Sequence, residues 1–157
     1  MDDEVLAVVA ASPLRRWMGI GTLVGVAGFA FYVMLSGSAS LSWQLFLICI
    51  GGGALWMADR MRRATEARLE LTATDLRVST GELVARVEDI EAVERGAFAF
   101  KPSNGFLVRT TTPGERAWRP GLWWRMGRRI GIGGVTPGHQ AKLMADIIAS
   151  ILMERSK

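Results

Sequence analysis

Two long runs of apolar residues occupy the first third of the chain, and no charged residue falls between Trp17 and Ala58. Residues 17–35 and 41–58 are nineteen and eighteen residues long, so as helices each reaches across roughly 30 Å of hydrocarbon at about 1.5 Å per residue. Buried core helices, or a cleaved signal peptide for the first run, are the alternatives. Because the first run exceeds a signal peptide's usual apolar length and a second run follows it, the pattern favours two transmembrane helices.

Beyond residue 67 the apolar residues recur with a period of two. Leu69, Leu71 and Ala73 share one side of a predicted strand at 68–73, as do Leu76, Val78 and Thr80 in the next. Turn residues separate these strands from the later ones. The predicted strands are 68–73, 76–80, 83–87, 94–101, 106–111, 116–119 and 129–134, with a short crossover at 88–93 in which Ile90 and Val93 face inward.

The chain ends in a predicted amphipathic helix. Thr136 is the candidate N-cap, and Pro137 suits the first helical position. Apolar residues then recur at spacings of three and four: Leu143, Met144, Ile147, Ile148, Ile151 and Leu152. Such a stripe packs against a small sheet or barrel. The predicted fold is therefore an α+β membrane protein, in which a transmembrane helical hairpin precedes a small antiparallel β-barrel or sheet with a C-terminal amphipathic helix.

The stretch LELTATDLRVSTGELVARVEDIEAV resembles the opening of bacterial pleckstrin-homology-like (PH-like) domains that follow paired membrane helices. The matching positions are Thr72 or Thr74, Leu76, Gly81, Val84 or Val87, Asp89-Ile90 and Val93. The resemblance covers residues 65–155 and implies a non-catalytic binding or assembly scaffold. Phosphoinositide-binding relatives carry basic residues around the first loop between strands, but here that loop is Ala73-Thr74-Asp75, so their lipid site is not carried over.

Arginines flank both predicted spans on the same side. They are Arg15 and Arg16 before the first span and Arg60, Arg62 and Arg63 after the second, whereas the loop 36–40 has no charge. The positive-inside rule then places both termini in the cytoplasm, with Trp17 and Trp56 at the cytoplasmic interface, and the resemblance to bacterial proteins implies the inner membrane. The predicted segments are a cytoplasmic N-terminal segment at 1–16, spans at 17–35 and 41–58, a non-cytoplasmic loop at 36–40, a basic juxtamembrane linker at 59–67 and the cytoplasmic PH-like domain at 68–155.

The region after the second span is basic, with seventeen Lys or Arg against twelve Asp or Glu from residue 59 onward, a difference of +5. Beside a bilayer, a basic domain favours anionic lipid headgroups. The segment 116–134 is the densest part, with five arginines and three of the six tryptophans. Its candidate contact residues for anionic lipid or an integral membrane partner are Arg119, Trp123, Trp124, Arg125, Arg128 and Arg129.

The Arg- and Trp-rich segment has two other interpretations, a structural one that stays open and a nucleic-acid one that is disfavoured. In one alternative, Trp118 and one of Trp123 and Trp124 fill the domain core while the arginines are solvated, and the sequence does not identify which of the two adjacent tryptophans is buried. A nucleic-acid surface is disfavoured because the domain is tethered close to the bilayer and carries no RNA-binding motif. The turn at 101–106 is a weaker candidate, in which Lys101 could touch a headgroup or a partner.

Small residues mark both predicted spans. Gly21 and Gly25 form a GxxxG pattern, and Gly51, Gly52 and Gly53 make a smooth patch. Such residues allow close contact between helices in lipid, and packing within the hairpin is favoured over contact with a partner's helix. The second possibility leads to an alternative function, an accessory or assembly subunit of an inner-membrane complex that is recognised through the hairpin.

Residues for chemistry are sparse. His139 is the only histidine, Cys49 lies in an apolar run, and the carboxylates between Glu88 and Glu94 are typical of a solvated face. Gly131 and Gly133 lack the spacing of a phosphate loop. We therefore predict no catalytic, cofactor or metal residue. The predicted function is a non-catalytic inner-membrane protein whose PH-like domain acts as an interaction module at the membrane surface, with its oligomeric state open.

Overall fold

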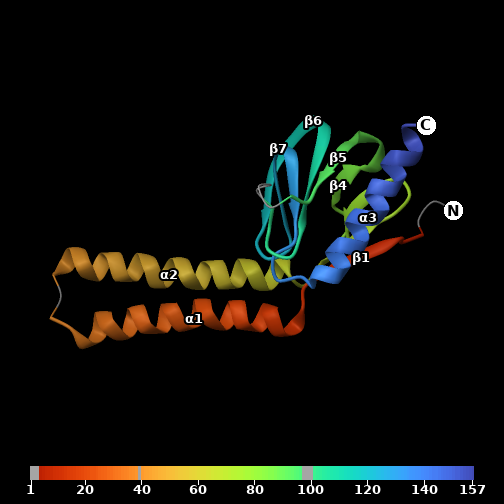
Figure 1. Ribbon diagram of the computed structural model, residues 1–157. Helices are drawn as coiled ribbons and strands as arrows, with labels where there is room; N and C mark the ends of the chain where they lie inside the picture. Colours follow the sequence, from red (N-terminus) through yellow and green to blue (C-terminus); the bar gives the residue numbers. More distant parts are fainter. Residues whose placement is uncertain (1–3, 39, 97–100) are drawn as a thin grey trace.

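The computed structural model describes residues 4–38, 40–96 and 101–157 (Figure 1). An antiparallel pair of helices, α1 (Pro13–Ser36) and α2 (Leu41–Ala64), projects from a β-rich domain. Both helices are long and apolar enough to cross a membrane. The chain is thus an α+β protein in which two long apolar helices precede antiparallel sheets and a C-terminal helix, as the sequence pattern predicts.

Helix α2 extends beyond the predicted span and takes in residues 59–64, which the sequence analysis assigned to a linker. Charge pairs at helical spacing support this extension: Arg63 lies 2.8 Å from Asp59, and Arg62 lies 2.9 Å from Glu66. Thr65 ends the helix by donating its hydroxyl to the Met61 carbonyl at 2.6 Å. The connection to the domain is therefore a tight turn rather than a flexible linker.

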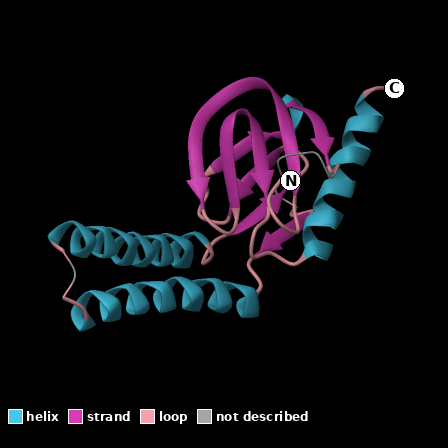
Figure 2. Ribbon diagram, turned by 60° about the vertical axis from the view of Figure 1, so that its left-hand side comes forward, coloured by secondary structure: helices cyan, strands magenta, loops and turns pink. Residues whose placement is uncertain are grey.

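The first sheet has the strand order β1-β2-β3-β4 and is antiparallel throughout. Its strands are β1 (Ala7–Ala10), β2 (Arg68–Leu71), β3 (Asp75–Val78) and β4 (Leu83–Arg86). Strand β1 comes from the segment before the hairpin, which was predicted only as a cytoplasmic N-terminal segment, and it places Val9 opposite Leu69. The helical hairpin connects β1 to β2, and these two strands pair with each other. The start of α1 and the end of α2 therefore both lie beside the β-rich domain (Figure 2).

The second sheet has the order β5-β6-β7, with β5 (Ile90–Glu94), β6 (Phe106–Arg119) and β7 (Trp123–Ile132). Strand β5 forms where a crossover was predicted, and the short turn η1 (Val87–Asp89) precedes it. Much of the strand predicted at 94–101 lies outside the described residues. The strands predicted at 106–111 and 116–119 are one continuous strand, because Pro113-Gly114 sits at a register irregularity with β7 instead of in a turn.

Helix α3 (Gly138–Arg155) covers the core of the domain. Met144 and Ile148 are fully buried, whereas Leu143, predicted on the apolar stripe, is exposed. Pro137 is the N-cap rather than the first helical residue. Apolar residues of both sheets and the helix form one cluster that includes Val9, Leu69, Leu76, Ile90, Phe106, Val108, Trp123, Ile130, Met144 and Ile148.

The domain is docked directly on the open end of the hairpin. The backbone N–H of Ser12 donates to the Val135 carbonyl at 2.8 Å, and Arg15 Nη1 donates to the Thr136 carbonyl at 3.2 Å. Val135 also packs against Ile20 and Met61, which belong to a small apolar cluster between the two helices. Backbone hydrogen bonds and apolar packing therefore fix how the sheets are oriented with respect to the helices.

Candidate functional site

The Arg–Trp segment of the sequence forms the end of β6 and nearly all of β7. In the antiparallel register Trp118 lies opposite Trp124, and Arg119 lies opposite Trp123. Residues directly opposite each other project from the same face of a sheet, and successive residues project from opposite faces. The segment therefore has two faces, with Trp123 on one and Trp124 on the other.

The inner face is occupied by contacts within the domain. Trp123 is only 3% exposed and belongs to the core. Arg119 Nη2 lies 3.0 Å from Glu82 Oε1 and 3.2 Å from Oε2, and Arg125 Nη1 donates to the Val84 carbonyl at 2.9 Å. Trp123, Arg119 and Arg125 were predicted on a contact surface, but the domain itself uses these side chains, so we remove them from that surface.

Arg128 is also held within the domain. Its Nε donates to the Thr110 carbonyl at 2.8 Å, and its Nη2 lies 2.8 Å from Glu91 Oε2. Glu91 lies 3.3 Å from Arg109 Nε, and Arg109 Nη1 lies 3.3 Å from Glu94 Oε1. Two of the carboxylates that the sequence suggested as a solvated face, Glu91 and Glu94, therefore pair with arginines of β6 and β7 and tie β5 to these strands.

We call the opposite side of the hairpin the outer face and define it by Arg116, Trp118, Trp124, Met126 and Arg129. Trp118 is 42% exposed, Met126 is 56% exposed, and Trp124 is half-buried. The Trp124 ring lies against the backbone of Gly131, where a Cβ atom would overlap the ring. A glycine at 131 thus lets the Trp124 ring approach the backbone closely.

The outer face combines apolar surface with free cations. The side chains of Arg116 and Arg129 are exposed, and within the described part of the chain neither guanidinium makes a hydrogen bond or an ion pair. Two shallow hollows meet at Trp124 and Met126, one of about 360 Å³ beside Trp118 and one of about 600 Å³ beside Lys101. Of the arginines predicted to contact lipid, Arg129 alone lies on this face.

The outer face is placed against the helical hairpin by an aromatic contact. The rings of Trp118 and Trp56 have centroids 6.4 Å apart, and the Arg60 guanidinium lies 5.4 Å from the Trp56 ring centroid. Trp56 lies about two helical turns before α2 ends at Ala64. Because Trp118 contacts α2 at that level, the outer face turns toward the side on which the helices project, while β6 and β7 run across their end (Figure 1).

The glycines of the helices divide into two groups. Gly51 packs against the Phe31 ring, where a Cβ atom would lie 2.8 Å from Phe31 Cζ, so this glycine serves hairpin packing. In the described part of the chain, Gly21 and Gly25 have no neighbouring atom within 4 Å of the position of a Cβ, and the same is true of Gly52 and Gly53. These four glycines thus leave open space beside the helices, and their role in helix packing stays a prediction.

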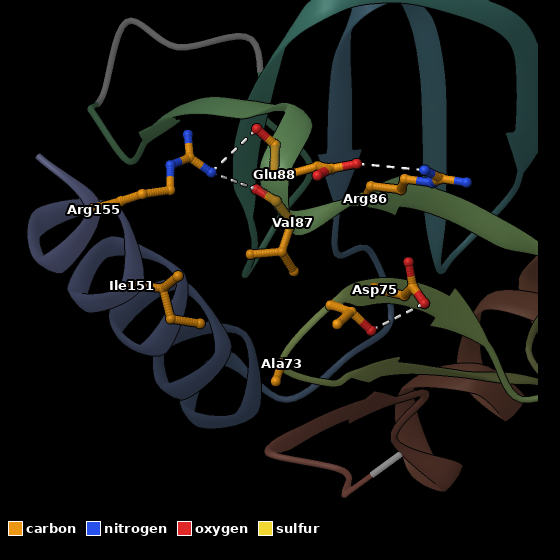
Figure 3. Close-up of a pocket in the computed structure, with 8 residues that line it drawn as sticks. Ala73, Asp75, Arg86, Val87, Glu88, Ile151 and Arg155 are labelled. Atoms are coloured by element: carbon orange, nitrogen blue, oxygen red, sulfur yellow. Dashed lines mark hydrogen bonds and ion pairs between the residues drawn. The ribbon is translucent and has the colours of Figure 1, made fainter. Parts of the chain in front are cut away.

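A hollow of about 480 Å³ lies between the end of α3, the β2–β3 turn and β4 (Figure 3). Its polar groups bond mainly to one another. Arg155 Nη1 donates to the carbonyls of Val87 and Glu88 at 3.0 and 3.1 Å, and Arg86 lies 3.4 Å from Glu88. Arg86 and Arg155 face Asp75 and Glu88, so the lining carries no net charge and this hollow offers little to an anionic ligand.

Residues suited to metal binding are not gathered in the part of the chain that is described: no group of three or more His, Cys, Asp or Glu side chains occurs there. Comparison with known proteins found no matching family model, curated protein or solved structure. The outer face is therefore the candidate site. Sequence reasoning missed Arg116, Trp118 and Met126 as its members.

Proposed function

We propose that this chain is a non-catalytic inner-membrane protein whose cytoplasmic domain rests with its outer face on the anionic surface of the bilayer. The contact between Trp118 and Trp56 carries this proposal. Trp56 stands near the end of a helix suited to span the membrane, where tryptophan prefers the headgroup region. An outer face that meets α2 at this level lies along the headgroups.

The charges of the outer face suit this position. Each Lys or Arg near an anionic leaflet contributes about 1 kcal/mol, so Arg116, Arg129 and the neighbouring Lys101 together contribute about 3 kcal/mol at moderate salt. Such a contact is weak for a freely diffusing protein. Here the hairpin already holds the domain at the surface, so a weak contact is sufficient to set its orientation.

The arrangement of two small antiparallel sheets with a C-terminal helix supports a PH-like binding module. The proposed orientation, with both termini in the cytoplasm, rests on the arginines at the open end of the hairpin, where Arg16 Nη2 donates to the Arg62 carbonyl at 3.2 Å. Strand β1, which precedes the first helix, completes the sheet of this module. Experiments therefore require the full chain, because a fragment that begins after α2 lacks an edge strand.

The test compares lipids around the full chain in mixed bilayers. Tryptophan fluorescence is quenched by brominated phosphatidylglycerol or, in a matched bilayer, by brominated phosphatidylcholine. We expect stronger quenching by the anionic lipid, and a smaller difference in high salt or in an Arg116→Glu/Arg129→Glu variant. Lys142→Glu/Lys157→Glu, two exposed lysines on and just after α3, is the matched control. Equal quenching by both lipids in the unmodified protein would contradict the lipid contact.

A second candidate function is an accessory subunit of a membrane complex, favoured by the unfilled space beside Gly21 and Gly25. These glycines leave a flat strip of α1 available to a partner's helix. Purification in mild detergent distinguishes the two functions. A stoichiometric partner lost in Gly21→Leu/Gly25→Leu, but kept in Arg116→Glu/Arg129→Glu, would support the accessory subunit, and a partner indifferent to the glycine changes would exclude this mode of recognition.

A further inference from the structure

A groove separates β4 from the second half of β6. Among residues 4–38, 40–96 and 101–157, strand β4 pairs only with β3, and β5 pairs with β6 only as far as Thr110. On that side, the stretch of β6 after Thr110 has no neighbouring strand among the described residues. Two unpaired strand edges therefore line the groove, and unpaired edges are templates for an added strand.

The groove has a volume of about 380 Å³. Leu83 and Val84 form one wall, Arg116 and Ala117 form the other, and Trp123 and Arg125 lie between them. The Val84 carbonyl accepts a hydrogen bond from Arg125. The C=O bond of Val84 therefore points away from β3 and toward the groove. A carbonyl oxygen has a second lone pair and remains open to another donor.

A buried donor beside the groove lacks an acceptor. Trp123 is only 3% exposed, and its Nε1 makes no hydrogen bond within the described part of the chain. Buried indole N–H groups are normally paired, because an unpaired donor loses its hydrogen bonds to water without replacement. An acceptor in the groove, such as a peptide carbonyl or carboxylate, would meet this requirement once the wall of the groove moves, because Nε1 itself has almost no exposed surface.

The charges around the groove favour an anionic occupant. Three arginines, Arg116, Arg119 and Arg125, face two glutamates, Glu82 and Glu115, which leaves one net positive charge. Arg119 and Glu82 neutralise each other at one end. Arg125 donates to the carbonyl groups of Gly127 and Val84, which do not neutralise its charge.

We propose that this groove binds an extended acidic peptide segment of a partner protein, inserted as a strand between β4 and β6. The backbone of the segment pairs with the two edges, an oxygen acceptor approaches Trp123 Nε1, and an acidic side chain pairs with Arg116 or Arg125. This site lies on the other side of β6 from the outer face, so it does not depend on the proposed lipid contact except that Arg116 borders both.

The test uses the full chain in nanodiscs of zwitterionic phosphatidylcholine, which removes the attraction to anionic lipid. Randomised linear heptapeptides displayed on phage are selected for binding to the protein in these nanodiscs. The enriched sequences are then synthesised for titration. We expect acidic, strand-forming sequences. On their addition the indole N–H resonance of Trp123, assigned with Trp123→Phe, should shift downfield.

Variants separate this site from a nonspecific charge effect. Trp123→Phe keeps an aromatic ring in the core but removes the donor, and it should weaken binding by about fivefold. Arg116→Glu should weaken binding about tenfold, whereas Lys142→Glu, the same charge change on exposed α3, should change it less than twofold. Selection of no sequence, selection of basic sequences, or unchanged binding in both groove variants would overturn the proposal. If the peptides bind but brominated phosphatidylglycerol and brominated phosphatidylcholine quench equally in the lipid test, only the proposed function is contradicted.

Discussion

The two faces of the β6–β7 hairpin contain the same kinds of residue but use them differently. On the inner face Trp123 fills the core, and Arg119 and Arg125 bind groups of the first sheet. On the outer face Trp118 and Arg129 are exposed, and the aromatic ring that pairs with Trp118 among the described residues is Trp56 of α2. A stretch rich in Arg and Trp is therefore not one surface, because alternation along the strands divides it into a structural half and a half available for binding.

The largest expected difference between the faces is in stability. Trp123→Ala leaves a cavity in the core and should lower the free energy of unfolding by about 3–5 kcal/mol, whereas Trp118→Ala on the outer face should change it by about 1 kcal/mol or less. Urea unfolding of the full chain in micelles, followed by near-ultraviolet circular dichroism, measures both. Equal losses in the two variants would contradict the division into faces.

Arginines provide the next comparison. Arg125→Met keeps the long side chain but leaves the buried side of the Val84 carbonyl without its donor, and should cost about 1.5–3 kcal/mol. Arg129→Met removes an exposed cation and should cost less than about 0.5 kcal/mol. The same unfolding measurement applies, and a larger loss at Arg129 would show that the outer face also has a structural role.

A smaller effect is expected where the outer face meets the helices. A double-mutant cycle on Trp56→Ala and Trp118→Ala should give a coupling energy of about 0.5–1.5 kcal/mol, typical of an aromatic pair. The cycle is read from the unfolding free energies of the two single variants and the double variant. A coupling near zero would mean that the domain is not held against α2 at this point.

Sequence patterns predicted the coarse architecture but not the strand that completes it. Long apolar runs and the change to period two are strong signals, and they gave the helical hairpin, the antiparallel sheets and the terminal helix. Strand β1 is only four residues long and directly precedes α1, so neither its length nor a turn marked it. Its pairing with β2 across the whole hairpin is a long-range contact that no local pattern reveals.

The candidate site was predicted by composition but not in detail. Alternation within β7 implies that Trp124 and Met126 share a face. Because Trp123 and Trp124 are adjacent and equally apolar, the sequence does not show which of the two faces is buried. The pairing with β6 settles it by placing Trp118 opposite Trp124. Whether an arginine is free also depends on distant carboxylates, as with Arg128 and Glu91, which are 37 residues apart in the sequence.

The central claim is that the outer face lies on the bilayer. The single cysteine makes a direct measurement possible: in a Cys49→Ala background, a nitroxide is attached to Met126→Cys on the outer face or to Leu143→Cys on α3, both exposed positions. Electron paramagnetic resonance then compares collisions with oxygen and with a water-soluble nickel chelate in anionic nanodiscs. We predict that the label at 126 is lipid-accessible and the label at 143 is in water; equal exposure to water at both positions would contradict the account.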